Sequence, residues 1–201
     1  IHASDLHIDS PLRGLDRYDG APVERLRSAT RSALERLVDK ALSERVDFLL
    51  LAGDIYDRDW QDFHTGLFFR GQMVRLERAG IRCFIVQGNH DAQGVISRQL
   101  TLPSNVTVFS SRAAQTVKLD ELSVAIHGRS FPEREVNEDL VPSYPPPVSG
   151  YFNIGLLHTS LTGRAGHDTY APTDLPTLVA KGYDYWALGH VHAREVLNER
   201  P

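Results

Sequence analysis

The sequence predicts an α/β fold with two packed sheets, and three observations support this prediction. Residues 1–87 alternate apolar segments with amphipathic ones in the order strand, helix, strand, helix, strand, which is typical of a parallel sheet. Residues 105–127 contain short alternating segments instead, which predict antiparallel strands and hairpins in a second sheet packed on the first. Asp, His and Asn repeatedly follow the apolar segments, at the edge where open α/β sheets bind ligands.

The first half of the chain supplies the parallel sheet. Residues 1–4 predict a first strand, and apolar residues at three- and four-residue spacings over 23–45 indicate an amphipathic helix. The continuous apolar run Phe48–Ala52 predicts a strand covered on both faces, because a half-exposed strand would alternate. A second helix over 62–78 and a buried strand over 81–87 are expected to follow.

The second half predicts shorter elements separated by loops. Residues 142–150 (PSYPPPVSG) predict a surface loop within one domain, because candidate site residues continue beyond it. Strands are expected over 153–158 and 184–189, with a helix over 173–181 between them. A further strand is expected to begin over 194–198.

Composition excludes several classes of protein. A chain of 201 residues predicts one globular domain, and no segment approaches the roughly 18 continuous apolar residues of a membrane helix. No secretory signal is visible, and the single Cys83 permits neither an internal disulfide nor a thiolate zinc site. These features predict a cytoplasmic protein. A net charge of −4 argues against a uniformly basic nucleic-acid surface, although not against a local one.

The predicted strand ends deliver side chains suited to metal binding. Each turn alone has an ordinary structural interpretation, but the pattern recurs along the chain. Oxygen and imidazole donors without sulfur suit Mn²⁺, Fe²⁺ or Zn²⁺. The candidate ligands are too many for one open site and fit two ions about 3.5–4 Å apart, with Asp54 of the central strand as the bridge. They are Asp5, His7, Asp54, Asn89, His158, His190 and His192.

This ligand set indicates hydrolysis of a phosphate ester. Two divalent ions bring more positive charge than Asp5 and Asp54 offset, which leaves a pocket suited to a phosphate and to an activated hydroxide nucleophile. His90 directly follows a candidate ligand and is therefore expected to point elsewhere and to protonate the leaving oxygen. Asp57 and Asp91 are expected to orient imidazoles.

The remaining histidines have ordinary structural interpretations. His2 is expected within a strand, and His64 and His167 on the surface. His127 closes the predicted strand over 122–127, and a role in the site is the less favoured interpretation.

Five motifs together resemble the calcineurin-like metallophosphoesterase family, and within it the SbcD/YhaO-type DNA repair exonuclease subgroup. They are DLH at 5–7, GDIYDR at 53–58, GNHD at 88–91, LLH at 156–158 and GHVH at 189–192. The resemblance implies a two-sheet αββα sandwich with a dimetal site. It assigns metal binding to the seven candidate ligands and the acid role to His90.

The resemblance also implies a cofactor and partners. Two divalent ions are expected, with Mn²⁺ favoured over Fe²⁺ or Zn²⁺. DNA is the expected substrate and an SMC-like ATPase the expected partner, with a homodimer also possible and no membrane involved. Archaeal and eukaryotic relatives have a His where this chain has Asp57, so any role of that His does not transfer. Such nucleases continue past GHVH into a capping domain, so residues 1–201 are expected to be the catalytic domain of a longer protein.

Three functions are compatible with these residues. The first is a metal-dependent DNA nuclease. The second is a phosphatase or small-nucleotide phosphodiesterase, which would use the same ligands. The third is a non-catalytic scaffold that binds DNA ends; a complete ligand set with His90 present argues against it.

Overall fold

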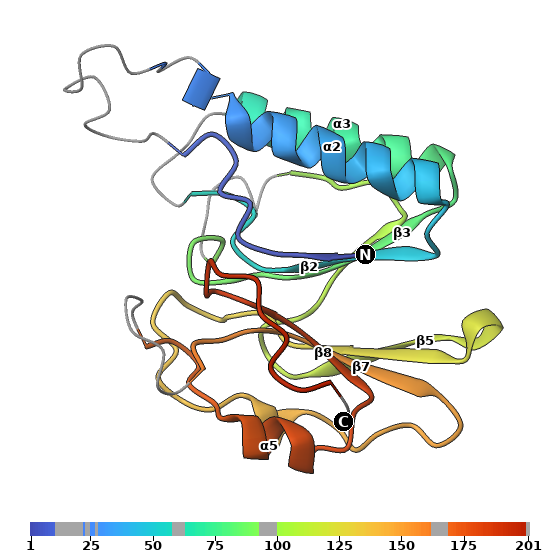
Figure 1. Cartoon of the computed structure of the whole chain (residues 1–201), viewed down its shortest axis with the longest axis vertical. Coiled ribbons are helices and arrows are strands. Elements are labelled where there is room, and N and C mark those ends of the chain that lie inside the picture. Colours follow the sequence, from blue (N-terminus) through green and yellow to red (C-terminus); the bar gives the residue numbers. More distant parts are fainter. Residues whose placement is uncertain are drawn as a thin grey trace.

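The chain folds into a four-layer αββα sandwich. The computed structural model describes residues 1–10, 22, 25–26, 28–57, 63–92, 100–161 and 169–199. Figure 1 shows two facing sheets, with α2 (Ala29–Glu44) and α3 (Phe63–Arg78) outside the upper sheet and α5 (Leu175–Ala180) outside the lower one. The predicted α/β fold with two sheets is therefore confirmed.

The upper sheet is parallel throughout. Its strand order is β1-β2-β3-β4, and each neighbouring pair runs in the same direction. Its strands are β1 (His2–Ala3), β2 (Phe48–Ala52), β3 (Arg82–Val86) and β4 (Val106–Val108).

The lower sheet is mixed. Its order is β5-β6-β7-β8; β5 and β6 form an antiparallel hairpin, whereas β6, β7 and β8 are parallel. Its strands are β5 (Gln115–Leu119), β6 (Val124–Gly128), β7 (Phe152–His158) and β8 (Tyr185–Gly189). Two short 3-10 helices, η2 (Asp120–Leu122) and η3 (Val141–Ser143), lie in its connections.

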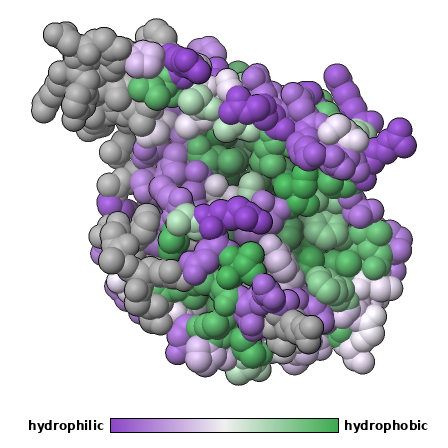
Figure 2. Space-filling model, viewed as in Figure 1, coloured by the Kyte–Doolittle hydropathy of each residue, from purple (hydrophilic) through white to green (hydrophobic). Residues whose placement is uncertain are grey.

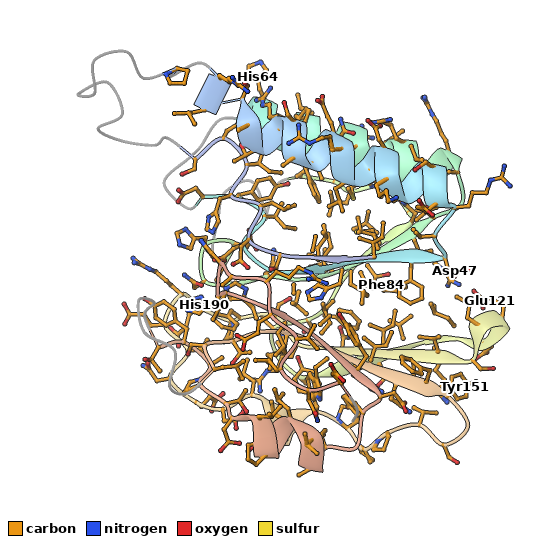
Figure 3. The ribbon with its side chains drawn as sticks, viewed as in Figure 1. Asp47, His64, Phe84, Glu121, Tyr151 and His190 are labelled. Carbon is orange, nitrogen blue, oxygen red and sulfur yellow. The ribbon has the colours of Figure 1, made fainter. Side chains whose placement is uncertain are left out.

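Alternation along β2 explains why a continuous apolar run is needed. Leu49 and Leu51 are buried with the helices α2 and α3, while Leu50 and Ala52 face the other sheet. Phe84 of β3 lies between the sheets in Figure 3 and packs edge-on against Phe48. Both faces of the upper sheet are therefore covered, and its strands contain almost no polar side chains.

Two predictions about elements need correction. The segment at 106–109 is not part of an antiparallel hairpin, because β4 pairs with β3 in parallel and completes the upper sheet. Val106 and Val108 alternate with a threonine, and this pattern specifies a strand without specifying its partner. No strand begins over 194–198 within the described residues 169–199. Within the described part of the helix predicted over 23–45, α2 begins at Ala29, and residues 25–26 are also helical.

The two ends of the sandwich differ in character. In Figure 3, His190 lies at one end, while Glu121 and Tyr151 lie at the opposite end. On the face viewed in Figure 2, apolar residues gather below the helix layer, in the region where Figure 1 shows the two facing sheets. Among the described helices, none is both long and apolar enough to cross a bilayer.

Cys83 is fully buried in β3, and burial raises the pKa of its thiol.

Candidate metal centre

Two loops lie side by side at the carboxyl end of the upper sheet. The loop after β1 and the loop after β2 are joined by backbone hydrogen bonds from Asp5 N–H to Gly53 O at 3.0 Å and from His7 N–H to Asp54 O at 3.1 Å. Asp5, His7 and Asp54 all have left-handed backbone, with φ of 54°, 40° and 53°. This conformation is uncommon outside glycine, and the paired loops hold it in place.

The first group of potential ligands joins the two sheets. Asp5, His7 and His192 each offer a ligand atom, all within 4.8 Å of one another. His192 Nε2 lies 3.5 Å from Asp5 Oδ1. The Asp5 carboxylate also accepts the backbone N–H of His190 at 3.0 and 3.1 Å, which fixes the loop after β8 against the loop after β1.

The second group is buried. Asp54, His158 and His190 again place their ligand atoms within 4.8 Å. His158 is the last residue of β7; its Nδ1 donates to Ala52 O at 2.8 Å, because a carbonyl only accepts. Its Nε2 therefore points the other way, 3.3 Å from Asp54 Oδ2 and 3.0 Å from the Asn89 side-chain oxygen. This arrangement brings Asn89 to the same group.

The charges of Asp54 and His158 depend on each other. Burial alone would raise the pKa of Asp54, but the attraction and hydrogen bond of His158, with the backbone N–H of His90, outweigh burial and lower that pKa. Burial likewise opposes the charge of His158, and the attraction of Asp54 reverses the effect and raises the pKa of His158. A divalent ion would replace the imidazole proton as the positive charge beside Asp54.

His7 provides a direct test of whether the residues fit a metal ion. Its Nε2 is buried and has no hydrogen-bond partner among the described residues; Asp54 Oδ2 lies 3.8 Å away. Burial lowers the pKa of His7 and keeps the imidazole neutral, with a lone pair available. A buried lone pair aimed at carboxylates and other imidazoles fits a divalent cation.

Two glycines allow these side chains to approach the backbone. An added Cβ at Gly53, which has φ of 88°, would collide with the ring of His158. A Cβ at Gly88 would lie 2.8 Å from His158 Nε2 and would also contact the Asp54 carboxylate. The Gly in each motif therefore makes room for His158, a candidate ligand from the other sheet.

His90 lies beside these groups, and with His7 and Asp57 it forms a third set whose potential ligand atoms lie within 4.8 Å of one another. Its ring meets that of His7 edge-on, with centroids 4.8 Å apart, and its backbone N–H donates to Asp54 Oδ1 at 2.9 Å. Its Nδ1 donates to Asp57 Oδ1 at 3.1 Å, because a carboxylate only accepts. Asp57 therefore orients an imidazole as predicted.

Among the described residues, the Asp91 carboxylate is bonded to backbone N–H groups and to no imidazole, contrary to the prediction. Its buried carboxylate accepts the backbone N–H groups of Ile55 and Tyr56 at 3.0 Å and of Gly88 at 3.2 Å. Burial, with repulsion from Asp54, raises the pKa of Asp91. Asp91 thus ties the loop after β3 to the loop after β2.

Three other histidines that the structure describes lie outside this cluster. His2 belongs to β1, and His64 is exposed, as predicted. His127 is fully buried on β6 between Thr116 and Asn153 and stacks on Tyr183, so it takes no part in the site. His167 lies outside the described residues.

Sequence reasoning missed three side chains around the site. Phe131 packs edge-on against His158 and Tyr170 against His190, with centroids 5.5 and 5.8 Å apart. Neither stands near its partner in the sequence, so no local pattern reveals the contact. Ser10 follows the DLH motif closely, and its hydroxyl donates to Asp57 Oδ2 at 2.7 Å.

An αββα sandwich with three neighbouring His–carboxylate groups at its strand ends, counted among the described residues, defines a metallophosphoesterase, an enzyme of metal-dependent phosphoester hydrolysis. The chain belongs to the calcineurin-like phosphoesterase family, whose model matches residues 1–194. The family uses a dimetal site, and the described ligand groups are the candidates for it.

Individual relatives are similar over most of the chain or over half of it. The uncharacterized metallophosphoesterase YhaO of Bacillus subtilis is 37% identical over 201 residues, covering 98% of this chain and 49% of that protein. The DNA double-strand break repair protein Mre11 of Methanopyrus kandleri is 24% identical over 95% of this chain and 44% of its own length. The SbcD component of the nuclease SbcCD of Escherichia coli is 27% identical over 55% of this chain and 26% of its own length. The chain thus spans about half the length, or less, of these relatives.

Proposed function

We propose that this chain is the catalytic domain of a DNA nuclease that uses two divalent ions. The observation that carries the proposal is the pair of ligand groups with Asp54 next to both: Asp54 Oδ2 lies 3.8 Å from His7 Nε2 and 3.3 Å from His158 Nε2. Asp5, His7 and His192 would hold one ion, and Asn89, His158 and His190 the other. Asp54 would bridge the two.

The protein's own residues would perform the remaining work. When bound, the ions would polarise the phosphate and lower the pKa of an attacking water. Asp5 and Asp54 are the acidic ligands of this arrangement, and the imidazoles are neutral donors, so the loaded site stays attractive to an anionic phosphodiester. In its imidazolium form, His90 would keep Nδ1–H bonded to Asp57 and would donate its Nε2 proton to the leaving oxygen.

DNA is favoured as the substrate by the relatives. Two similar proteins are named for DNA double-strand break repair and for nuclease activity. Mn²⁺ is the proposed native ion; the imidazole and oxygen donors suit Fe²⁺ and Zn²⁺ as well. The SMC-like ATPase partner, the homodimer and the cytoplasmic location stay predictions from the sequence resemblance.

A phosphatase or small-nucleotide phosphodiesterase is the second candidate. It is favoured by the relative with the highest identity among those described, YhaO, whose name specifies a metallophosphoesterase and no substrate. The same ligand groups would serve that reaction, so the site geometry favours neither candidate over the other.

One experiment separates these functions. The purified protein is assayed with Mn²⁺ on linear double-stranded DNA, on a nitrophenyl phosphodiester and on a nitrophenyl phosphomonoester, with Asp54→Ala as the inactive control. Cleavage of DNA and of the diester supports the nuclease. Preference for the monoester, or for small diesters with DNA left intact, overturns it in favour of the second candidate. Absence of turnover with Mn²⁺, Fe²⁺ and Zn²⁺ alike would contradict both.

A further inference from the structure

We propose that Ser10 is a positioning residue that holds Asp57 in the orientation needed to fix the imidazole of His90. Ser10 Oγ donates to Asp57 Oδ2 at 2.7 Å, and Asp57 Oδ1 accepts from His90 Nδ1 at 3.1 Å. The three half-buried side chains therefore form a continuous series of hydrogen bonds. The catalytic consequence of this series rests on the function proposed above.

Two helices hold the backbone immediately before Ser10. Asp9 has left-handed backbone, with φ of 58°, and its N–H donates to Thr30 Oγ1 at 3.1 Å. Its carboxylate accepts two hydrogen bonds from Arg31 of α2, at 2.6 and 2.7 Å, and one from Thr65 of α3 at 2.6 Å. Charge-assisted bonds in a bidentate arrangement are strong and directional. The position of Ser10 is thus set by the helix layer.

Ser10 is also fixed to the ligand loop itself. Its N–H donates to the backbone oxygen of His7 at 3.1 Å, and Ile8 forms a parallel bridge with Tyr56. The hydroxyl of Ser10 therefore faces the neighbouring loop at Asp57. The series runs from the loop after β1, through the loop after β2, to the loop after β3.

The second hydrogen bond of Asp57 has a specific consequence for His90. A carboxylate bonded through one oxygen can rotate about its terminal torsion, which is broad for Asp. A donor on the other oxygen restricts that rotation, so Asp57 keeps one oxygen directed at His90 Nδ1. The imidazole then keeps its Nδ1–H on Asp57 and directs Nε2 away from it, and in the imidazolium form Nε2 carries the proton that is donated to the leaving oxygen. Removing the Ser10 hydroxyl would loosen His90 without changing any candidate ligand.

Kinetics with two leaving groups test the catalytic part of the proposal. Ser10→Ala is compared with Ser104→Ala, whose hydroxyl also donates to a carboxylate, Glu77, at 2.8 Å on an exposed surface. Ser10→Ala is expected to lower kcat on a dinucleotide about tenfold or more, with KM unchanged. A nitrophenyl diester, whose leaving group needs no proton, should lose far less. Ser10→Thr, which keeps the hydroxyl, should restore the dinucleotide rate. Equal rates for Ser10→Ala and Ser104→Ala would overturn the catalytic role.

A spectroscopic measurement tests the positioning directly and does not depend on activity. Long-range ¹H–¹⁵N correlation spectra of the metal-free protein report the tautomer of His90, with His90→Gln identifying its signals. The wild type and Ser10→Thr should show the Nδ1–H tautomer, and Ser10→Ala a mixture of tautomers. If Ser10→Ala does not fold, Ser10→Cys, with its weak donor, replaces it. An unchanged tautomer in the variant would contradict the inference even if the wild type cleaves DNA. The predicted change would support it even if the wild type cleaves nothing.

Discussion

His90 lies in the loop after β3, and its orienting acid, Asp57, lies in the loop after β2. The hydrogen bond between them distinguishes this histidine from the candidate ligands. Its side chain bonds to Asp57, whereas Asn89, its neighbour in the chain, points to His158. Adjacent residues thus take different tasks because successive side chains in the loop point in different directions.

This division predicts the behaviour of His90→Ala. The variant should keep both ions and lose about 10²–10⁴-fold in kcat on DNA or a dinucleotide, the usual contribution of a positioned acid. The loss should shrink on a nitrophenyl ester. Metal analysis and kinetics on both substrates provide the measurement. Reduced metal content together with equal losses on both substrates would identify His90 as a ligand instead.

His127 predicts a pH dependence of stability away from the site. Burial lowers the pKa of this imidazole below its ordinary value of 6.5, against the opposing hydrogen bond to Asn153 and with some help from the charge of Lys181. Between the two pKa values the unfolded chain binds a proton that the folded chain does not, so stability falls as the pH drops below about 6.5. Above that pH the group contributes no slope.

Urea unfolding at pH 8 and at pH 5.5 measures this effect. The free energy of unfolding should fall less between these pH values in His127→Gln than in the wild type. His64→Gln, at an exposed position of α3, is the matched control and should follow the wild type. An identical fall in all three proteins would show that His127 keeps its proton equally in both states.

At the scale of the elements, the loops of the site carry unusual backbone. Asp5, His7 and Asp54 have left-handed φ, and so does His190 at 96°. Residues in such conformations cost on the order of 1–3 kcal/mol each and persist where their surroundings over-determine them. Here the paired loops, the Asp5 carboxylate on His190 N–H and the Asp91 carboxylate on three backbone N–H groups offset that cost.

The close approach of these loops predicts different outcomes for two glycine substitutions. Gly88→Ala places a methyl group against His158 and Asp54, so metal affinity and activity should fall about tenfold or more. Gly71→Ala, in the middle of α3 with no atom within 4 Å of the added carbon, should stabilise the fold by about 0.5–1 kcal/mol. Calorimetric metal titration and urea unfolding measure both. Full metal affinity in Gly88→Ala would show that the loops can rearrange.

The sequence predicts a structural feature wherever the residues of that segment alone are enough to specify it. The run Phe48–Ala52 predicts a doubly covered strand because both of its faces must be apolar, and the strand ends follow from the motifs. The partner of β4 is not predictable, since its two valines fit a strand in either sheet. The donors to the Asp91 carboxylate are not predictable either, because they are backbone N–H groups, and the identity of a residue does not indicate where its backbone N–H points.

The whole molecule divides the candidate ligands between its two layers of strands. Asp5, His7, Asp54 and Asn89 follow strands of the upper sheet, whereas the site histidines at 158, 190 and 192 belong to the lower one. Bound ions would therefore connect the two sheets as well as serve the reaction.

This division predicts that metal stabilises the fold. Each ion at a concentration 100 times its Kd should add about 2.7 kcal/mol to the free energy of unfolding and raise Tm. Asp54→Ala, which removes the carboxylate next to both ligand groups, should abolish most of that increase along with activity. Differential scanning calorimetry with and without Mn²⁺, paired with metal analysis, provides the measurement. A Tm insensitive to every divalent ion, or two ions retained by Asp54→Ala, would contradict the proposed bridge.

The hydrogen bond between His190 N–H and Asp5 joins residues 185 positions apart in the chain. Both ligand groups include a histidine from the loop after β8. During translation, therefore, neither group can assemble while that loop is still inside the ribosome. The emerging chain has no complete set of ligands for either ion until residues 190–192 have left the ribosome.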